Sequence, residues 1–460
     1  MADYDVVVLG AGPGGYVAAI RAAQLGMRTA VVERDNVGGV CLNWGCIPSK
    51  ALLRNAEVLS LIREAEEFGI SFDNLRVDFG KAIDRSREVV GRLTRGVEML
   101  LRKNKVELIK GKATLAGRNT VRVEDIGQTF ITENVIIATG AREREIPGLP
   151  VDREVVITSR EALELREVPS KVVIVGGGAT GAEFAHVYRT YGAEVTIVEL
   201  LPRLVPQEDE ETSKALQRAF GKQGIETLTG SAVQGVSVSG GRASVSVSTG
   251  DETTEIVADK VLVAVGVQGN IEGLGLEVLG VETERGSIVV GDAMETNVPG
   301  VYAVGDVTGK MLLAHVASAQ GVTAVETIAG MSPPKLDYTL MPRAIYCKPQ
   351  VASFGLTEAQ AREQGFEVKI GKFPFAASGK ALALSEVDGL VKLVVDSEVG
   401  EILGAHMVGS EVTELLGEVA MTKLLEGTTA ELGWLVHPHP TISEMLKEAA
   451  LAVDGKAIHS

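Results

Sequence analysis

Two cysteines in the N-terminal part of the chain could exchange electrons. Cys41 and Cys46 lie in the segment Gly38-Gly39-Val40-Cys41-Leu42-Asn43-Trp44-Gly45-Cys46-Ile47-Pro48-Ser49-Lys50, with four residues between them. A disulfide between them closes a very small loop and stabilises less than a bond that closes a long one. The pair is therefore suited to a bond that is made and broken, although two buried, unreactive thiols are the ordinary alternative.

The surrounding elements must bring the two sulfurs together. In a regular helix their Cα atoms would lie about 7.5 Å apart along the axis, beyond disulfide reach. Gly45 gives the backbone freedom to bend, and Pro48 lacks the N–H that would bond to Trp44. The sequence therefore predicts a distorted first turn of a helix.

A possible proton acceptor lies near the C-terminus, in His437-Pro438-His439-Pro440-Thr441 with Ser443-Glu444. Thiol–disulfide exchange needs a thiolate, and a thiol with a pKa near ~8.5 is mostly protonated at neutral pH. His439 could accept that proton, and Glu444 could fix its tautomer and raise its basicity. A turn or packing role is the alternative for His439. We interpret His437 as structural and Cys347 as a buried core thiol.

Composition narrows the classes of protein. The chain has 460 residues, 45% of them hydrophobic, which predicts about three domains with ample core. Its net charge of −16 argues against nucleic acid and anionic membrane as partners. No stretch of about 18 apolar residues predicts a membrane span, and a strand begins too early for a signal peptide. We expect a cytoplasmic protein without a disulfide framework.

Residues 5–33 predict a strand, a helix and a second strand around Gly10-Ala11-Gly12-Pro13-Gly14-Gly15. In this G-x-G-x-x-G pattern Gly10 permits the tight turn, Gly12 lets a pyrophosphate approach, and Gly15 allows close helix–strand packing. The helix N-terminus favours phosphate. Glu33 ends the second strand and is placed to accept hydrogen bonds from a ribose. The segment predicts a dinucleotide site.

The pattern returns in the middle of the chain, where Gly176, Gly178 and Gly181 follow the strand Lys171–Val175. Gly176 and Glu199 are 23 positions apart, as are the first glycine and the acid of the first copy. Each copy then runs through short strands to a closing strand, which ends at Thr139-Gly140 or at Gly266. The sequence therefore predicts that a dinucleotide-binding domain has been duplicated within the chain, with the cysteine segment inserted in the first copy.

Two nucleotide sites beside a cysteine pair indicate electron transfer. A nicotinamide passes hydride, a dithiol exchanges electrons through thiolates, and a flavin couples the two. The cysteines lie in the first copy, so we expect the flavin there and the nicotinamide in the second. Glu199 accepts from a ribose 2′-hydroxyl and repels a 2′-phosphate, which favours NAD, although Arg203 stands nearby.

The rest of the chain alternates helices and strands. Helical patterns cover about 49–68 and 79–104, and Ser332-Pro333-Pro334 indicates a domain boundary. Residues 341–460 mix strands at Ala344–Cys347, Leu390–Asp396 and Glu401–Val408 with helices, which indicates an α+β domain.

Over essentially its whole length, the chain resembles the flavin-dependent pyridine nucleotide–disulfide oxidoreductases. The resemblance rests on the cysteine segment, both glycine patterns, Ala138-Thr139-Gly140, Gly305-Asp306, Leu313-Ala314-His315 and the C-terminal His-Pro segment. It implies an α/β fold with two Rossmann-like dinucleotide-binding domains and a C-terminal α+β dimerisation domain. The implied bounds are 1–146 with 271–335 for FAD, 147–270 for NAD, and 336–460 for dimerisation.

The resemblance also implies roles. Cys41 exchanges with the substrate, Cys46 faces the flavin, Lys50 and Glu183 lie at the flavin face, and His439 reaches the disulfide of the partner subunit. Asp306 binds the FAD ribityl chain. The other implied cofactor contacts are Thr139, Gly140, Gly266, Leu313, Ala314 and His315.

The implied activity is oxidation of protein-bound dihydrolipoyl groups, with hydride transfer to NAD. The partners would be a second copy, sharing the active site, and the lipoyl-bearing component of a 2-oxo acid dehydrogenase or glycine cleavage complex. A glutathione- or mercuric-reductase-like enzyme is an alternative. An NAD-responsive flavoprotein component of a multienzyme complex, with catalysis secondary, is another.

Some positions depart from the family pattern. Val267-Gln268-Gly269-Asn270 replaces Gly-Arg-x-Pro-Asn after its glycine, so a positive charge is missing. Gln320 and Gln350 stand where acids are common, Arg142-Glu143-Arg144 where Ser and Pro are frequent, and Trp44 where an aliphatic residue is usual. These departures bear on cofactor affinity and partner preference rather than on the reaction class.

Overall fold

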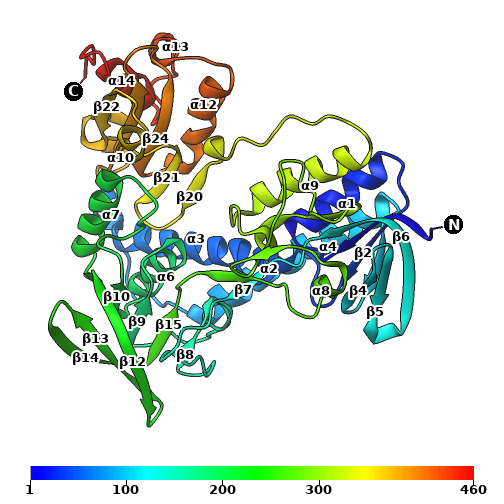
Figure 1. Cartoon of the computed structure of the whole chain (residues 1–460). Coiled ribbons are helices and arrows are strands. Elements are labelled where there is room, and N and C mark those ends of the chain that lie inside the picture. Colours follow the sequence, from blue (N-terminus) through cyan, green and yellow to red (C-terminus); the bar gives the residue numbers. More distant parts are fainter. Residues whose placement is uncertain (1, 460) are drawn as a thin grey trace. The chain divides into compact units, whose positions relative to one another are not determined.

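The structure is a computed structural model that describes residues 2–459 (Figure 1). The chain divides into two compact units. The first holds the chain up to Ala51, Lys81–Arg144 and Gly266–Leu336, and the second holds Leu52–Gly80, Glu145–Val265 and the chain from Asp337 on. The second unit includes both the second nucleotide-binding copy and the C-terminal domain, so the division into three domains stays a prediction.

The first unit is built on a largely parallel sheet with strand order β3-β2-β1-β6-β5-β4 and β19 beside β6. β5 and β4 pair antiparallel, whereas β3, β2, β1, β6 and β19 run parallel. Its elements are β1 (Tyr4–Leu9), α1 (Pro13–Gln24), β2 (Thr29–Glu33), α4 (Phe79–Lys103), β3 (Glu107–Lys110), β4 (Ala113–Gly117), β5 (Thr120–Val123), β6 (Gln128–Ile137), β19 (Val301–Ala303) and α9 (Ala314–Ile328). α4 begins in the second unit.

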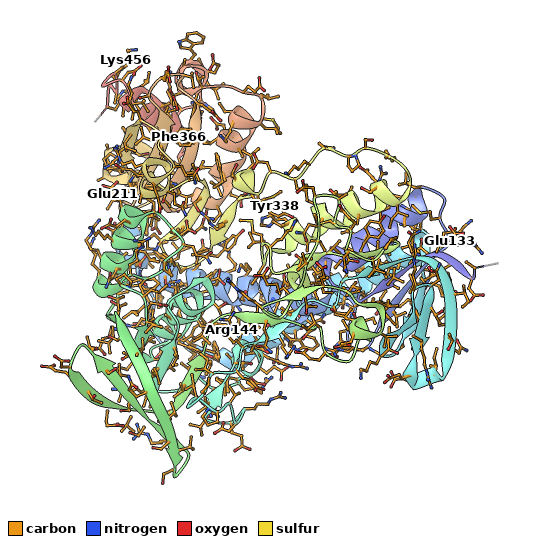
Figure 2. All side chains as sticks on the ribbon, viewed as in Figure 1. Glu133, Arg144, Glu211, Tyr338, Phe366 and Lys456 are labelled. Carbon is orange, nitrogen blue, oxygen red and sulfur yellow. The ribbon has the colours of Figure 1, made fainter. Side chains whose placement is uncertain are left out.

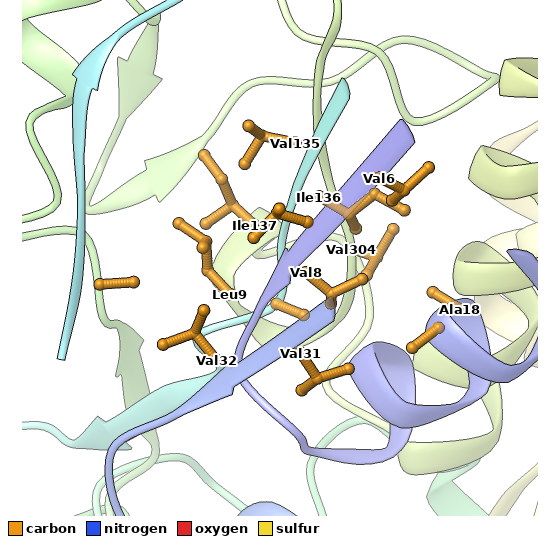
Figure 3. Packing of buried hydrophobic residues seen from close by; sticks show 14 of the residues in the cluster. Val6, Val8, Leu9, Ala18, Val31, Val32, Val135, Ile136, Ile137 and Val304 are labelled. Atoms are coloured by element: carbon orange, nitrogen blue, oxygen red, sulfur yellow. The ribbon is translucent and has the colours of Figure 1, made fainter. Parts of the chain in front are cut away.

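The central strands of this sheet are covered on both faces. Val6, Val8 and Ile136 have no exposed surface, as expected for parallel strands with continuous apolar runs. Figure 3 shows their side chains with those of β2 and with Ala18 of α1.

The second unit repeats the arrangement with the parallel order β11-β10-β9-β15-β8. Its elements are β8 (Val156–Ile157), β9 (Lys171–Val175), α6 (Ala179–Thr190), β10 (Glu194–Glu199), α7 (Glu210–Lys222), β11 (Ile225–Thr229) and β15 (Lys260–Val263), with the antiparallel β12 (Ser231–Ser239), β13 (Arg242–Thr249) and β14 (Glu252–Ala258). The Gly10 N–H donates to Val32 O at 2.8 Å, and the Gly176 N–H donates to Val198 O at 2.8 Å. The two copies share this turn in detail, which confirms the duplication.

The C-terminal segment forms an antiparallel sheet of order β20-β21-β24-β23-β22. Its elements are β20 (Arg343–Ile345), β21 (Gln350–Gly355), α10 (Glu358–Glu363), β22 (Val368–Pro374), α11 (Gly379–Ala383), β23 (Leu390–Asp396), β24 (Ile402–Gly409), α12 (Val412–Leu424), α13 (Thr429–Trp434) and α14 (Glu444–Ala452). The α+β prediction is confirmed, but the sequence missed β21 and β22.

Shorter elements connect these sheets. They are α2 (Gly39–Trp44), α3 (Cys46–Arg63), β7 (Ala141–Glu143), α5 (Ser159–Ala162), β16 (Val267–Gly269), α8 (Leu276–Leu279), β17 (Thr283–Glu284), β18 (Ser287–Ile288) and the 3₁₀ turns Ala65–Phe68, Glu124–Ile126, Gly305–Thr308, Tyr338–Leu340 and Phe375–Ala377. Among the described helices, none combines the length and apolar character needed to cross a bilayer.

A buried ionic cluster fastens α7 to the C-terminal sheet. Lys392 of β23 is 2% exposed, and its Nζ lies 2.9 Å from Asp209 Oδ1 and 2.9 Å from Glu358 Oε2. Glu211, labelled in Figure 2, brings a third carboxylate to 3.1 Å. Asp209 also accepts the N–H groups of Glu211 and Glu358 near the starts of α7 and α10. The lysine therefore neutralises carboxylates that hold two helix N-termini.

Lys392→Met should destabilise the protein strongly because it leaves these carboxylates buried without their cation. We expect a loss of about 3 kcal/mol in the free energy of unfolding, measured by urea titration. Lys214→Met is the matched control, since Lys214 forms an exposed ion pair with Glu210 on α7. It should leave the free energy of unfolding nearly unchanged, because both side chains of that pair are exposed. Equal losses in the two variants would contradict the role of burial.

Candidate active site and nucleotide sites

The cysteine segment contains the predicted break. α2 ends at Trp44, Gly45 has φ −137° and ψ −111°, and α3 starts at Cys46. A Cβ on Gly45 would lie 3.1 Å from Val40 O and 3.4 Å from Cys41 Cα, so a side chain there would crowd the turn that holds Cys41. The prediction of a distorted turn is confirmed.

The two cysteines interact as free thiols, and both are half-buried. A hydrogen bond joins their side chains, and this bond together with burial raises the pKa of the Cys41 thiol. The positive charge of Lys50 opposes that shift in the pKa of Cys41. Cys347 is a buried thiol that donates to Pro349 O, as the sequence predicts.

Asn43, between the two cysteines, has a positioning role that the sequence did not reveal. Its side chain is buried, and Nδ2 donates to Val37 O at 3.0 Å and to Gly39 O at 2.9 Å. Arg87 of α4 donates to the Asn43 carbonyl oxygen at 2.8 Å. The amide thus holds the loop before α2 against the helix that carries Cys41.

The two glycine patterns open helices in the same way. Gly12 and Gly178 are the N-cap residues of α1 and α6, and no side chain caps either helix. A Cβ on Gly15 would lie 1.9 Å from Gly10 O, and one on Gly181 would lie 1.9 Å from Gly176 O. Close packing therefore requires glycine at these positions, and the uncapped N–H groups suit a pyrophosphate.

The strand-end acids hold the glycine turns. Glu33 accepts the N–H of Ala11 through Oε2 at 2.7 Å and that of Asp35 through Oε1 at 2.7 Å. Glu199 accepts the N–H of Gly177 at 2.6 Å and that of Leu201 at 2.8 Å in the same manner. Each carboxylate oxygen keeps a further lone pair, so both acids can also accept a ribose hydroxyl.

Asp306 follows the closing strand of the first sheet and is half-buried in the 3₁₀ turn Gly305–Thr308. Burial raises the pKa of Asp306 to about 6. Gln320 of α9, a departure from the family pattern, accepts the Gly305 N–H at 2.7 Å and so fixes this turn. α9 begins at Ala314 after the N-cap Leu313, with His315 in its first turn. A desolvated carboxyl beside an uncapped helix fits a polyhydroxylated chain such as ribityl.

The closing loops of the two copies meet within the first unit. Thr139 Oγ1 donates to Asn270 O at 2.8 Å, and Asn270 Nδ2 donates to Thr139 O at 2.9 Å. Gly140 and Gly266 have φ values of +69° and +96°, which favour glycine. The two loops are therefore fastened to each other.

Three predicted catalytic residues lie in the second unit. Glu183 of α6 is 5% exposed and accepts the Tyr346 N–H at 3.0 Å. His439 Nδ1 lies 2.9 Å from Glu444 Oε1, and Glu444 Oε2 accepts the Thr441 N–H at 2.8 Å. Burial raises the pKa of Glu444, but the bonds from Thr441 and His439 outweigh it and leave that pKa lowered. The imidazole is 80% exposed, so its other nitrogen is open to a substrate.

His437 differs from its neighbour. Its Nε2 lies 2.7 Å from Glu418 Oε1, and its side chain is only 4% exposed. This placement agrees with a structural role.

Comparison with known proteins shows the family of this chain. The family model described as "pyridine nucleotide-disulphide oxidoreductase" matches residues 4–321. The model for the dimerisation domain of the same family matches residues 341–450. The chain belongs to this family. It is therefore an FAD- and NAD-dependent flavoprotein oxidoreductase, and its C-terminal domain is a dimerisation domain.

Individual relatives are similar over the full length. The chain is 50% identical to a protein of Mycobacterium leprae named dihydrolipoyl dehydrogenase, with 100% of both chains covered. It is 47% identical to one of that name from Bacillus subtilis, with 99% of each covered. The crystal structure of LpdA from Mycobacterium tuberculosis matches with a TM-score of 0.90 and 25% identity, covering 97% of this chain and 98% of that one.

Asp306→Asn should stabilise the FAD-free protein at neutral pH. Burial raises the folded-state pKa to about 6 from 3.8, so the charged carboxylate opposes folding above pH 6 and less so below it. We expect urea titration to show a gain of about 2 kcal/mol at pH 7.5 and less than half of that at pH 4.5. A gain that does not depend on pH would contradict this origin.

Proposed function

We propose that the chain is a dihydrolipoyl dehydrogenase, which oxidises protein-bound dihydrolipoyl groups to the disulfide and reduces NAD. The observation that carries this proposal is the hydrogen-bonded pair Cys41 and Cys46 at the Gly45 break, in the unit that carries the first glycine pattern. The names and the full-length similarity of the relatives support it.

The thiol exchange begins from the oxidised pair, in which a disulfide joins Cys41 and Cys46, and residues of this chain accept both protons. His439 takes the proton of one lipoyl thiol, and the resulting thiolate attacks Cys41 Sγ, which breaks the Cys41–Cys46 bond and frees the Cys46 thiolate. The second lipoyl sulfur then attacks the first, its proton passes to Cys41, and the lipoyl disulfide leaves. The raised pKa of Cys41 keeps that thiol protonated in the reduced pair.

The cofactors complete the electron path. Bound FAD supplies a two-electron carrier that accepts from thiols and donates to a nicotinamide. Asp306, Glu33 and the uncapped start of α1 would hold FAD, with Leu313, Ala314 and His315 at its ring. Cys46 would face that ring, with Lys50 one helical turn further along α3, and Glu183 would adjust nicotinamide access.

Glu199 directs the second site to NAD rather than NADP. Its two oxygens are bound to backbone N–H groups, so the carboxylate cannot swing away from a 2′-phosphate. Arg203 donates to Pro206 O at 3.1 Å within its own loop, which keeps its guanidinium engaged there.

The active site is shared between two subunits, with His439 of one subunit serving the cysteine pair of the other. The residues just before the His-Pro segment support this, because Trp434 and Val436 are 76% and 84% exposed. Large apolar side chains with that exposure favour burial against a partner. A second copy that covers them would bring the neighbouring His439 into the interface.

The lipoyl substrate would come from the lipoyl-bearing component of a 2-oxo acid dehydrogenase or glycine cleavage complex. A cytoplasmic location fits Cys347, which is a buried thiol, and a Cys41–Cys46 pair whose bond is made and broken.

Anaerobic titration tests the function. The purified flavoprotein should take up two electrons from dihydrolipoamide and develop a long-wavelength absorption band, because the Cys46 thiolate would face the bound flavin. Added NAD should then yield NADH. A protein that forms no NADH would refute the function, and one that forms NADH without the band would refute the Cys46 assignment.

Mixed dimers test the shared site. His439→Gln and Cys41→Ser dimers should each lose most activity, since general-base and exchange roles are each worth about a hundredfold or more. After dissociation and 1:1 reassociation, half of the dimers are hybrids with one complete site, so about a quarter of the wild-type activity should return. The reassociated mixture will stay inactive if each subunit serves its own cysteines. His437→Gln is the control and should retain activity.

A further inference from the structure

A small antiparallel ribbon lies where the chain crosses between its two units. β7 pairs with β16, with Arg142 opposite Gln268 and Ala141 opposite Gly269. The first unit is left after Arg144 and re-entered at Gly266, so both crossing strands belong to this ribbon.

Asn270 connects the ribbon to the loop Thr139-Gly140. In addition to the two bonds with Thr139, its N–H donates to Gly140 O at 2.9 Å. Gly269 packs so closely that a Cβ would lie 2.6 Å from Gly286 O, which fixes the backbone on the other side of Asn270. The family resemblance implies that Thr139 and Gly140 contact a cofactor, and they end the copy in which we propose that FAD binds.

Arg142, on the strand paired with β16, forms hydrogen bonds to the segment 269–272. Its Nη1 donates to Gly269 O at 3.0 Å, to Asn270 Oδ1 at 3.3 Å and to Glu272 Oε2 at 2.9 Å. Its Nη2 donates to Glu272 Oε1 at 2.8 Å, so the pair with Glu272 is bidentate. Hydrogen bonding to Arg142 lowers the pKa of Glu272.

The positive charge near residues 269–272 comes from β7, the strand paired with β16. The family pattern places an arginine at position 267, where this chain has valine. Arg142, on the paired strand, brings a cation within hydrogen-bond distance of residues 269–272.

We propose that Arg142 is a positioning residue for FAD. Its guanidinium holds Asn270 and Glu272, and Asn270 in turn holds the Thr139-Gly140 loop in the shape that retains the cofactor. This inference rests on the proposed binding of FAD at that loop.

Arginine is required because one planar fork must reach a carbonyl, an amide and a carboxylate together. A lysine at this position keeps the charge but has a single ammonium group, so it should not restore the hydrogen bonds to Gly269, Asn270 and Glu272 together.

The test compares Arg142→Met with Arg144→Met. Arg144, labelled in Figure 2, is exposed, and the one hydrogen bond described for its side chain goes to Val267 O at 3.5 Å. The readout is the rate at which the holoenzyme releases FAD on dilution into mild urea, followed by flavin fluorescence. Arg142→Met should release FAD about five- to tenfold faster than wild type, Arg142→Lys nearly as fast, and Arg144→Met at the wild-type rate.

A double-mutant cycle tests the route through Asn270. Asn270→Ala should accelerate release, and adding Arg142→Met should change the rate no further, because the arginine acts through that amide. The FAD-free forms of Arg142→Met and Arg144→Met should unfold at the same temperature. If Arg142→Met acted through a general loss of stability, its FAD-free form would unfold at the lower temperature.

The outcomes separate this inference from the function. If Arg142→Met and Arg144→Met release FAD equally fast, or if the two mutations of the cycle add, the positioning role is overturned while the function stands. If the wild-type protein binds no FAD, the proposed function and this role both fall.

Discussion

The structure depends on one residue in each nucleotide-binding copy whose backbone N–H and carbonyl are both hydrogen-bonded. In the first copy the Ala11 N–H donates to the buried carboxylate of Glu33, and the Ala11 carbonyl accepts the Gly38 N–H at 2.8 Å. In the second copy Gly177 does the same with Glu199 and the Val205 N–H. A buried carboxylate is costly unless it is hydrogen-bonded, so each glycine turn and its acid stabilise each other. Each acid, which we propose as a ribose acceptor, is thereby held in place by backbone N–H groups of its own copy.

This anchor also explains how one duplicated fold serves two purposes. The residue held by Ala11 is Gly38, directly before α2, so the helix that carries Cys41 is tied to the glycine turn of its own copy. The matching bond in the second copy holds only the loop that contains Arg203. Asn43 then fixes the segment from within, and the Gly45 break turns α3 so that Cys46 can meet Cys41. The insertion is therefore positioned by backbone bonds that the second copy uses for a plain loop.

The sequence predicted those parts of the fold whose signal is local. Glycine spacing, apolar strands and the terminal acids placed both nucleotide folds, and the His439–Glu444 pair lies only five residues apart. β22 was missed because it carries the exposed Lys369 and Lys372 and ends at Pro374, so no regular alternation of apolar residues marks it. β21 is buried, yet small residues such as Ser353 conceal it. The role of Arg142 depends on contacts about 130 positions away, which no local pattern reveals.

The departures from the family pattern share a physical logic. Gln320 accepts the Gly305 N–H without placing a second carboxylate next to Asp306, so the raised pKa of Asp306 comes from burial. Gln350 accepts from the N–H and hydroxyl of Thr413 at the start of α12, a position where an amide oxygen serves as well as an acid. In both cases the acceptor is kept and the charge is dropped. Since a buried charge costs more than a neutral acceptor, these exchanges retain the hydrogen bonds at a lower desolvation cost.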